Sequence, residues 1–157
     1  MLQTADLFVE TARMIEGRAL SEENVLLNIP YGVNAGLAVE LYLKCLVSIE
    51  CGQVPRTHNL KKLFCQLRRE TRKRLKQNHD QIADQDQSFG VLRQHGVATD
   101  LLSLLENGQE AFEWFRYPYE PDFHNKPASF TLTLFGACVR DFILDLRPEW
   151  LSKNQRE

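Results

Sequence analysis

The apolar residues of this chain are most concentrated between Ala35 and Ile49, where they cover nearly the whole circumference of a predicted helix. A helix that is apolar on most sides is typical of the centre of a bundle, because it packs on several neighbours at once. One polar stripe interrupts it at a four-residue step, formed by Gly36, Glu40, Lys44 and Ser48. Glu40 lies one turn before Lys44, which is the favourable order for an ion pair. Since burying a charge is costly, the stripe must either face a cleft or meet partners from elsewhere in the chain.

Other segments of the chain also show apolar residues at the three- and four-residue spacing of helices. They are expected to cover about 5–18, 57–67, 99–117 and 129–146. Their N-terminal caps are predicted at Thr4, Thr57, Thr99 or Asp100, and Ser129. The central helix is expected to end at Cys51 and Gly52. No segment has the two-residue period of a strand, so the pattern predicts an all-α protein. We expect a single domain spanning 1–157, folded as an up-and-down bundle of about five helices.

The sequence after Leu67 is strongly basic and has almost no apolar face. Between Lys61 and Lys76 eight basic residues stand against the single acid Glu70, although the whole chain has a net charge of -2. We interpret this stretch as a solvated helical extension that frays into a polar loop, with a flexible segment around 77–98. A charge run of this kind is most often a solvated helix face. Its alternative role is to attract phosphate groups or an acidic partner.

The composition mainly excludes classes of protein. The chain has 157 residues, 43% hydrophobic and 25% charged, which fits one globular domain with a sizeable core. No uninterrupted apolar run approaches the ~20 residues of a membrane span, and the N-terminal residues carry acids without a basic leader. A soluble, cytoplasmic protein without a membrane partner is therefore expected. Cys45, Cys65 and Cys138 fall on apolar helical positions, which predicts reduced core thiols. No metal site and no cofactor are expected, because the four histidines are scattered.

Three groups of polar residues remain at positions where a helical bundle has no structural need of them. Besides Glu40 and Lys44, His58 lies in a turn before a helix, where it suits packing and capping as well as function. The third group is the charged, aromatic turn Arg116-Tyr117-Pro118-Tyr119-Glu120, followed by Asp122 and His124. Arg116 suits the C-terminus of a helix, an ion pair with Glu40, or recognition of a phosphate or carboxylate beside the tyrosine rings.

Three motifs occur in a characteristic order. They are Ala38-Val39-Glu40-Leu41-Tyr42-Leu43-Lys44, then Thr57-His58-Asn59-Leu60-Lys61-Lys62-Leu63-Phe64 after a glycine turn, then Phe112-x-x-Phe115-Arg116-Tyr117-x-Tyr119-Glu120. Over roughly residues 5–146 the chain thereby resembles the HEPN domains, the "higher eukaryotes and prokaryotes nucleotide-binding" helical bundles. The resemblance implies a compact bundle of four to five helices that often forms homodimers. It also implies a role in prokaryotic toxin–antitoxin, defence or RNA-processing systems. The partners would be RNA, a nucleotide, or a small nucleotidyltransferase or antitoxin protein.

The resemblance also implies a site. The binding residues carried over from the motifs are Glu40, Lys44, His58, Arg116, Tyr117 and Glu120. Catalytic HEPN proteins are metal-independent RNases with an R-x4-6-H motif, in which the arginine positions the scissile phosphate and the histidine assists 2′-hydroxyl attack. The candidate catalytic pair here is Arg116 and His124, which seven residues separate, two of them prolines. Arg74 and His79 are separated by four residues and form the second candidate pair.

Three hypotheses follow for the function. The first is a HEPN-like binding module, a homodimer associated with RNA, a nucleotide, or a nucleotidyltransferase or antitoxin protein. The alternative is a metal-independent endoribonuclease that acts as a toxin or defence effector. In the third, the polar stripe is an internal ion-pair network and the basic run is a solvated helix face.

Overall fold

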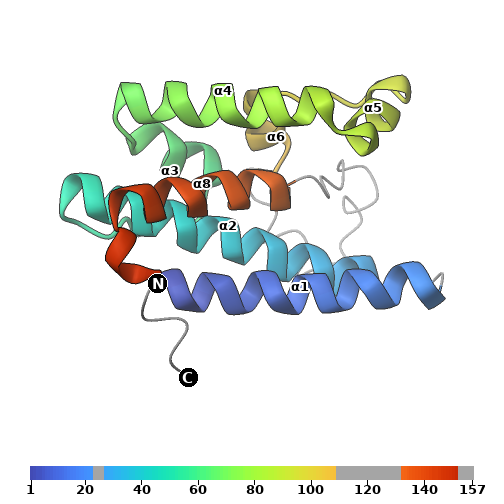
Figure 1. Ribbon diagram of the computed structural model, residues 1–157, viewed down its shortest axis with the longest axis horizontal. Coiled ribbons are helices and arrows are strands. Elements are labelled where there is room, and N and C mark those ends of the chain that lie inside the picture. The colour runs from blue at the N-terminus through green and yellow to red at the C-terminus, as the bar shows by residue number, and fades with distance from the viewer. Residues whose placement is uncertain (23–26, 109–131, 152–157) are drawn as a thin grey trace.

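The computed structural model describes residues 1–22, 27–108 and 132–151. Within these ranges the chain forms seven α-helices and a short 3-10 helix and contains no strand, which confirms the all-α prediction. Figure 1 shows α2 and α8 in the middle of the molecule, between α1 on one side and α4 on the other. The helices outnumber the roughly five expected because the stretch after residue 57 is divided into three.

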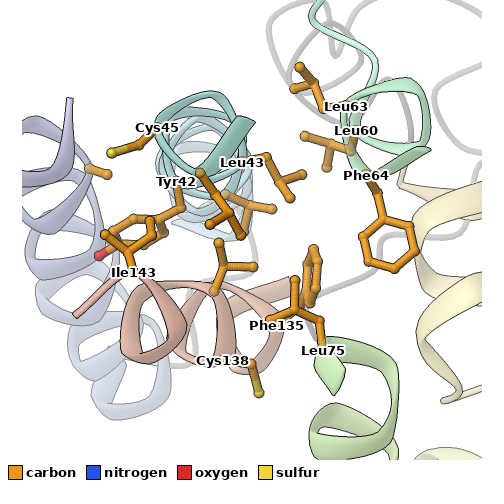
Figure 2. Packing of buried hydrophobic residues seen from close by; sticks show 14 of the residues in the cluster. Tyr42, Leu43, Cys45, Leu60, Leu63, Phe64, Leu75, Phe135, Cys138 and Ile143 are labelled. Carbon is orange, nitrogen blue, oxygen red and sulfur yellow. The ribbon is translucent and has the colours of Figure 1, made fainter. Parts of the chain in front are cut away.

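The central helix is α2, Asn28–Cys51, as its apolar circumference predicts. Both α1, Leu2–Glu22, and α8, Leu132–Leu146, pack against it. The main core lies where α2 meets α8 and α3, and Figure 2 shows its side chains interdigitating there. Its fully buried members include Tyr42, Leu43, Leu60, Leu63, Phe135 and Ile143. Gly136 allows α8 to approach α2 closely, because a Cβ at this position would lie 3.2 Å from Val39 Cγ2.

The length and composition of α2 would also suit a membrane span. Residues Ile29–Cys51 form a 23-residue apolar helix, but 67% of its most apolar window is buried inside the protein. The core helix of a soluble bundle has the same properties, so α2 is weak evidence for membrane insertion. The helix ends where predicted, at Gly52, whose φ of 74° is readily adopted only by glycine and whose N–H closes the last turn on Ser48 O.

The basic stretch is divided into two helices by a short extended segment. The first is α3, Leu60–Gln66, and its N-terminal cap is Asn59, whose side chain accepts a 2.8 Å hydrogen bond from Lys62 N. The predicted cap at Thr57 is therefore wrong, because the Thr57 hydroxyl accepts from Asn59 N at 3.2 Å instead. Leu67 and Arg68 are extended, with ψ of 153° and 149°, and they turn the chain into the next helix.

The residues after Arg68 form two helices where the sequence led us to expect a fraying extension and a polar loop. These are α4, Arg69–Gln85, and α5, Gln87–Gln94, which is capped by Asp86. The buried face of α4 consists of Thr71, Leu75, His79 and Ala83. These positions are four residues apart, but only Leu75 is strongly apolar, so the hydrophobic pattern does not reveal the face. Most of the segment around 77–98 that was expected to form a polar loop is thus helical.

The start of α6 and the end of α8 agree better with the sequence. Asp100 caps α6, Leu101–Asn107, by accepting from Ser103 N at 3.1 Å, which confirms one of the two predicted caps. Pro148 follows α8 and begins the 3-10 helix η3, Pro148–Trp150. The predicted cap at Ser129 lies outside the described residues, and so does the second half of the helix expected over 99–117.

The four cysteines are all free thiols, in two environments. Cys45 and Cys138 are buried as predicted, and burial raises the pKa of both thiols, that of Cys138 to about 11. Cys65 is exposed, so its predicted place in the core is wrong. The reason is that α3 has only seven residues and turns Leu60, Leu63 and Phe64 toward the core, which leaves Cys65 facing solvent.

Candidate functional site

The polar stripe of α2 meets a partner from elsewhere in the chain. Glu40 is only 2% exposed, and its Oε1 forms an ion pair with Lys44 Nζ at 2.8 Å. Nδ1 of His58 lies 3.0 Å from the same oxygen and donates to it, because a carboxylate oxygen can only accept. Glu40 Oε2 is buried and has no hydrogen-bond partner among the described residues. Lys44 and His58 thus both contact Oε1, while the buried Oε2 has no partner in the described part of the chain.

The turn before α3 brings His58 to α2. Thr57 and Asn59 fix this turn, since the Thr57 hydroxyl accepts from Asn59 N and the Asn59 side chain caps α3. The side chain of His58 is 56% exposed, whereas that of Lys44 is 12% exposed. The imidazole therefore connects the solvent with a buried carboxylate. With the cation of Lys44 beside Glu40, the arrangement suits recognition of a ligand by charge and hydrogen bonds.

The structure separates the second candidate catalytic pair. Both Arg74 and His79 lie on α4, but a five-residue step turns the helix by about 140° between them. His79 is fully buried, with its ring against Phe89 and Phe135. Arg74 is exposed, and its guanidinium lies over the Phe142 ring, 4.8 Å from the ring centroid. A shared phosphate cannot reach both side chains, so this pair does not form an RNase site.

His79 belongs instead to a polar cluster that joins α4 to α6. Asp80 accepts hydrogen bonds from Lys76 Nζ, from His79 Nδ1 at 3.0 Å and from Leu101 N at 2.9 Å. Burial by itself raises the pKa of the Asp80 carboxyl group, but the hydrogen bonds from Lys76, His79 and Leu101 outweigh burial, and the pKa is lowered. The carboxylate thus remains charged and holds the first turn of α6 on α4.

A second polar cluster, which the sequence analysis missed, lies in a cleft between α1 and α8. Asp6 Oδ1 accepts from the Tyr42 hydroxyl at 2.6 Å and from Arg140 Nε at 2.7 Å. Burial and then the hydrogen bond to Asp6 raise the pKa of Tyr42. The cleft has a volume of about 610 Å³ and also exposes Glu10 and Arg13. The single cation in the apolar run of the last helix, Arg140, is the signal that could have revealed this cluster.

Several predicted site residues cannot be compared with this geometry. Of the predicted binding residues the structure brings together Glu40, Lys44 and His58, while Arg116, Tyr117, Glu120 and the predicted catalytic His124 lie outside the described residues. In the described ranges there is no group of three or more His, Cys, Asp or Glu side chains that could hold a metal ion. Comparisons of the chain with protein-family models, curated proteins and solved structures found no match.

Proposed function

We propose that this chain is a HEPN-like helical binding module that holds RNA or a nucleotide at the polar stripe of α2. The environment of the Glu40 carboxylate is the observation that supports this proposal most directly. Its carboxylate is almost completely buried, yet one oxygen has no hydrogen-bond partner among the described residues. A buried charged oxygen of this kind favours an N–H donor, because leaving it unpaired costs about 1–3 kcal/mol or more.

The chemistry of the neighbouring side chains fits a nucleotide. The amino groups on the edges of nucleic-acid bases are N–H donors of the type that Glu40 Oε2 favours. Lys44 and His58 offer nitrogen donors beside it, and a phosphate group accepts from such donors. In the proposed site the resemblance to HEPN domains adds Arg116 as a phosphate ligand and Tyr117 and Glu120 as further contacts.

The resemblance also supplies the wider setting of the proposal. The module acts in the cytoplasm as a homodimer, and a nucleotidyltransferase or antitoxin protein is its protein partner. Size-exclusion chromatography with light scattering tests the homodimer directly, because a monomer of 18.2 kDa at micromolar concentration would contradict it.

The experiment that tests the proposal compares binding of labelled RNA and of single nucleotides in EDTA. We expect His58→Ala to weaken the binding of both ligands at least tenfold, because it removes the exposed donor of the site. The matched control is His95→Ala, an exposed histidine on another helix end, which should leave binding unchanged. Glu40→Gln should also weaken binding, and its melting temperature shows whether the fold persists.

The same experiment decides against the proposal in two ways. If RNA and nucleotides stay unbound while Glu40→Gln lowers the melting temperature, the stripe is an internal ion-pair network. If RNA is cleaved in EDTA and Arg116→Ala or His124→Ala abolishes cleavage, the chain is the metal-independent endoribonuclease of the alternative hypothesis. Arg74→Lys should leave any cleavage unchanged, because Arg74 lies on the other side of α4 from His79.

A further inference from the structure

The first two turns of α4 carry cations that form no ion pair within the described ranges. Arg69 and Lys73 are exposed, lie one turn apart, and form no ion pair within the described ranges. Arg72 lies on the same flank, and its buried Nε has no hydrogen-bond partner there either. With Lys76 these residues follow the spacing that places side chains on one side of a helix. We call Arg69, Arg72 and Lys73 the α4 basic stripe.

Several cations elsewhere in the described chain form ion pairs. Lys61 bonds to Glu106 at 2.9 Å, and Arg140 bonds to Asp6 at 2.7 Å. Lys76, the next residue along the flank, donates to Asp80. Glu70 is the single acid in the first two turns, one position from Arg69, and it forms no ion pair with either exposed member of the stripe. The positive charge of the stripe is therefore not balanced by its neighbours.

The stripe opposes the stability of its own helix. A cation in the first turn of a helix, such as Arg69, is disfavoured by the helix dipole. The like charges of Arg69 and Lys73, one turn apart, repel each other as well. The remaining acids of the helix, Asp80 and Asp84, lie toward its C-terminal end, which is also the unfavourable end for acids. Helix stability thus does not explain this distribution of charge, whereas binding of a polyanion does.

We propose that the α4 basic stripe binds the phosphate backbone of a nucleic acid. Two arginine side chains can each offer two parallel N–H donors to a phosphate, and side chains one turn apart have Cβ atoms about 5–6 Å apart, so that one phosphate fits between them. No large apolar side chain of 61–78 is exposed, although both protein interfaces and membrane-binding helices need such anchors. The face also has no aromatic residue for base stacking, so it contacts the backbone independently of sequence.

The stripe has a defined position relative to the stripe of α2. Glu50, near the end of α2, accepts hydrogen bonds from Thr71 Oγ1 and from Arg68 N, and so holds the start of α4. Glu50 follows Glu40 by ten residues, about 15 Å along the helix. The start of α4 is therefore anchored to the same helix that carries Glu40. This inference rests on the proposed function for the identity of its ligand and adds a backbone-binding surface to it.

The test measures binding of a fluorescent single-stranded RNA of about 20 nucleotides at several salt concentrations, by anisotropy. The variant is Arg69→Glu/Lys73→Glu, whose exposed, unpaired side chains are not needed for folding; circular dichroism checks this. We expect at least a tenfold loss of affinity at low salt. The log–log slope of affinity against salt should become shallower by about 1.4, because about 0.7 is lost with each of two phosphate contacts.

Two controls separate a local effect from a change in net charge. Arg69→Lys/Lys73→Arg keeps the charge and should stay within about threefold of the wild type, since the phosphate contacts remain. The second control is Arg13→Glu on α1, which lies across the bundle from α4 in Figure 1. It reverses one charge, as Arg69→Glu alone does, and it should have no effect on binding. An equal loss of affinity in Arg13→Glu and Arg69→Glu would overturn the inference.

Single nucleotides distinguish this inference from the proposed function. The double reversal should leave their affinity unchanged, whereas His58→Ala should reduce it. If the double reversal changes neither the affinity for RNA nor the salt slope, the stripe does not bind the backbone, although the α2 site still can. If poly-glutamate of equal charge competes as well as RNA, the surface serves acidic proteins and the assignment to nucleic acid is wrong. If duplex DNA binds as tightly as RNA, recognition of the backbone alone is supported.

Discussion

The hydroxyl group of Thr71 on α4 donates a hydrogen bond to the carboxylate of Glu50 at the end of α2. The other oxygen of this carboxylate accepts from Arg68 N at 2.8 Å, and the Arg68 guanidinium donates to the Glu50 carbonyl at 3.1 Å. A single acid thus fixes the angle at which α4 leaves the extended segment after α3. The orientation of the α4 basic stripe follows from this contact.

Removal of this hydroxyl should destabilise the protein. We expect Thr71→Val, which keeps the shape of the side chain, to lower the free energy of unfolding by about 1–2 kcal/mol, because Thr71 is buried and its bond to a charged group is lost. Urea denaturation measures the change. The control is Thr11→Val on α1, whose exposed hydroxyl donates only to Leu7 O within its own helix and whose loss should change stability by less than about 0.5 kcal/mol.

Asp80 should make the stability depend on acidity. Since hydrogen bonds lower the pKa of the folded carboxyl group below its ordinary value of 3.8, the unfolded chain takes up the proton first as the pH falls. The stabilisation is therefore present in full well above pH 3.8 and is lost as the pH falls below it. When unfolding in urea is measured at a series of acidic pH values, the free energy of unfolding should fall less steeply with pH for Asp80→Asn than for the wild type. Part of the slope should remain, because the hydrogen bond with Ser103 lowers the pKa of Asp100 as well.

His79 and His95 should respond very differently to the same substitution. His79 is fully buried between Phe89 and Phe135, so His79→Ala leaves a cavity and removes one donor to Asp80. We expect a loss of about 2–4 kcal/mol, in the range for large-to-small core substitutions. The exposed His95 should tolerate alanine within about 0.5 kcal/mol. A stable His79→Ala variant would contradict the placement of this residue in the core.

Alanine substitutions at two helical glycines should change the stability in opposite directions. Gly136→Ala brings a methyl group within 3.2 Å of Val39 Cγ2, and the overpacking should outweigh the gain in helix propensity, for a net loss of about 1 kcal/mol. Gly90→Ala in α5 meets no atom within 4 Å and should stabilise the protein by about 0.5–1 kcal/mol. Thermal melting of both variants checks the signs, and a higher melting temperature for Gly136→Ala would show that α8 and α2 are less tightly packed.

The candidate site was partly predictable from the sequence. Glu40 and Lys44 are four residues apart on one helix, so their ion pair follows from local geometry. His58 joins the same oxygen across 18 residues, a contact that depends on how the turn before α3 returns to α2. No local pattern indicates that return. The stripe could be expected to meet a partner, but its identity could not be deduced.

The sequence by itself determined the all-α class, the central position of α2 and its end at Gly52. These features depend on residues within a few positions of each other, namely the period of the apolar side chains and the backbone freedom of glycine. Only the tertiary structure decided that His79 is buried, that Cys65 is exposed, and that Asp6 and Arg140 are joined across 134 residues. The physical reason is that a helix specifies which residues share a face, whereas the helices packed around it decide which face is removed from water.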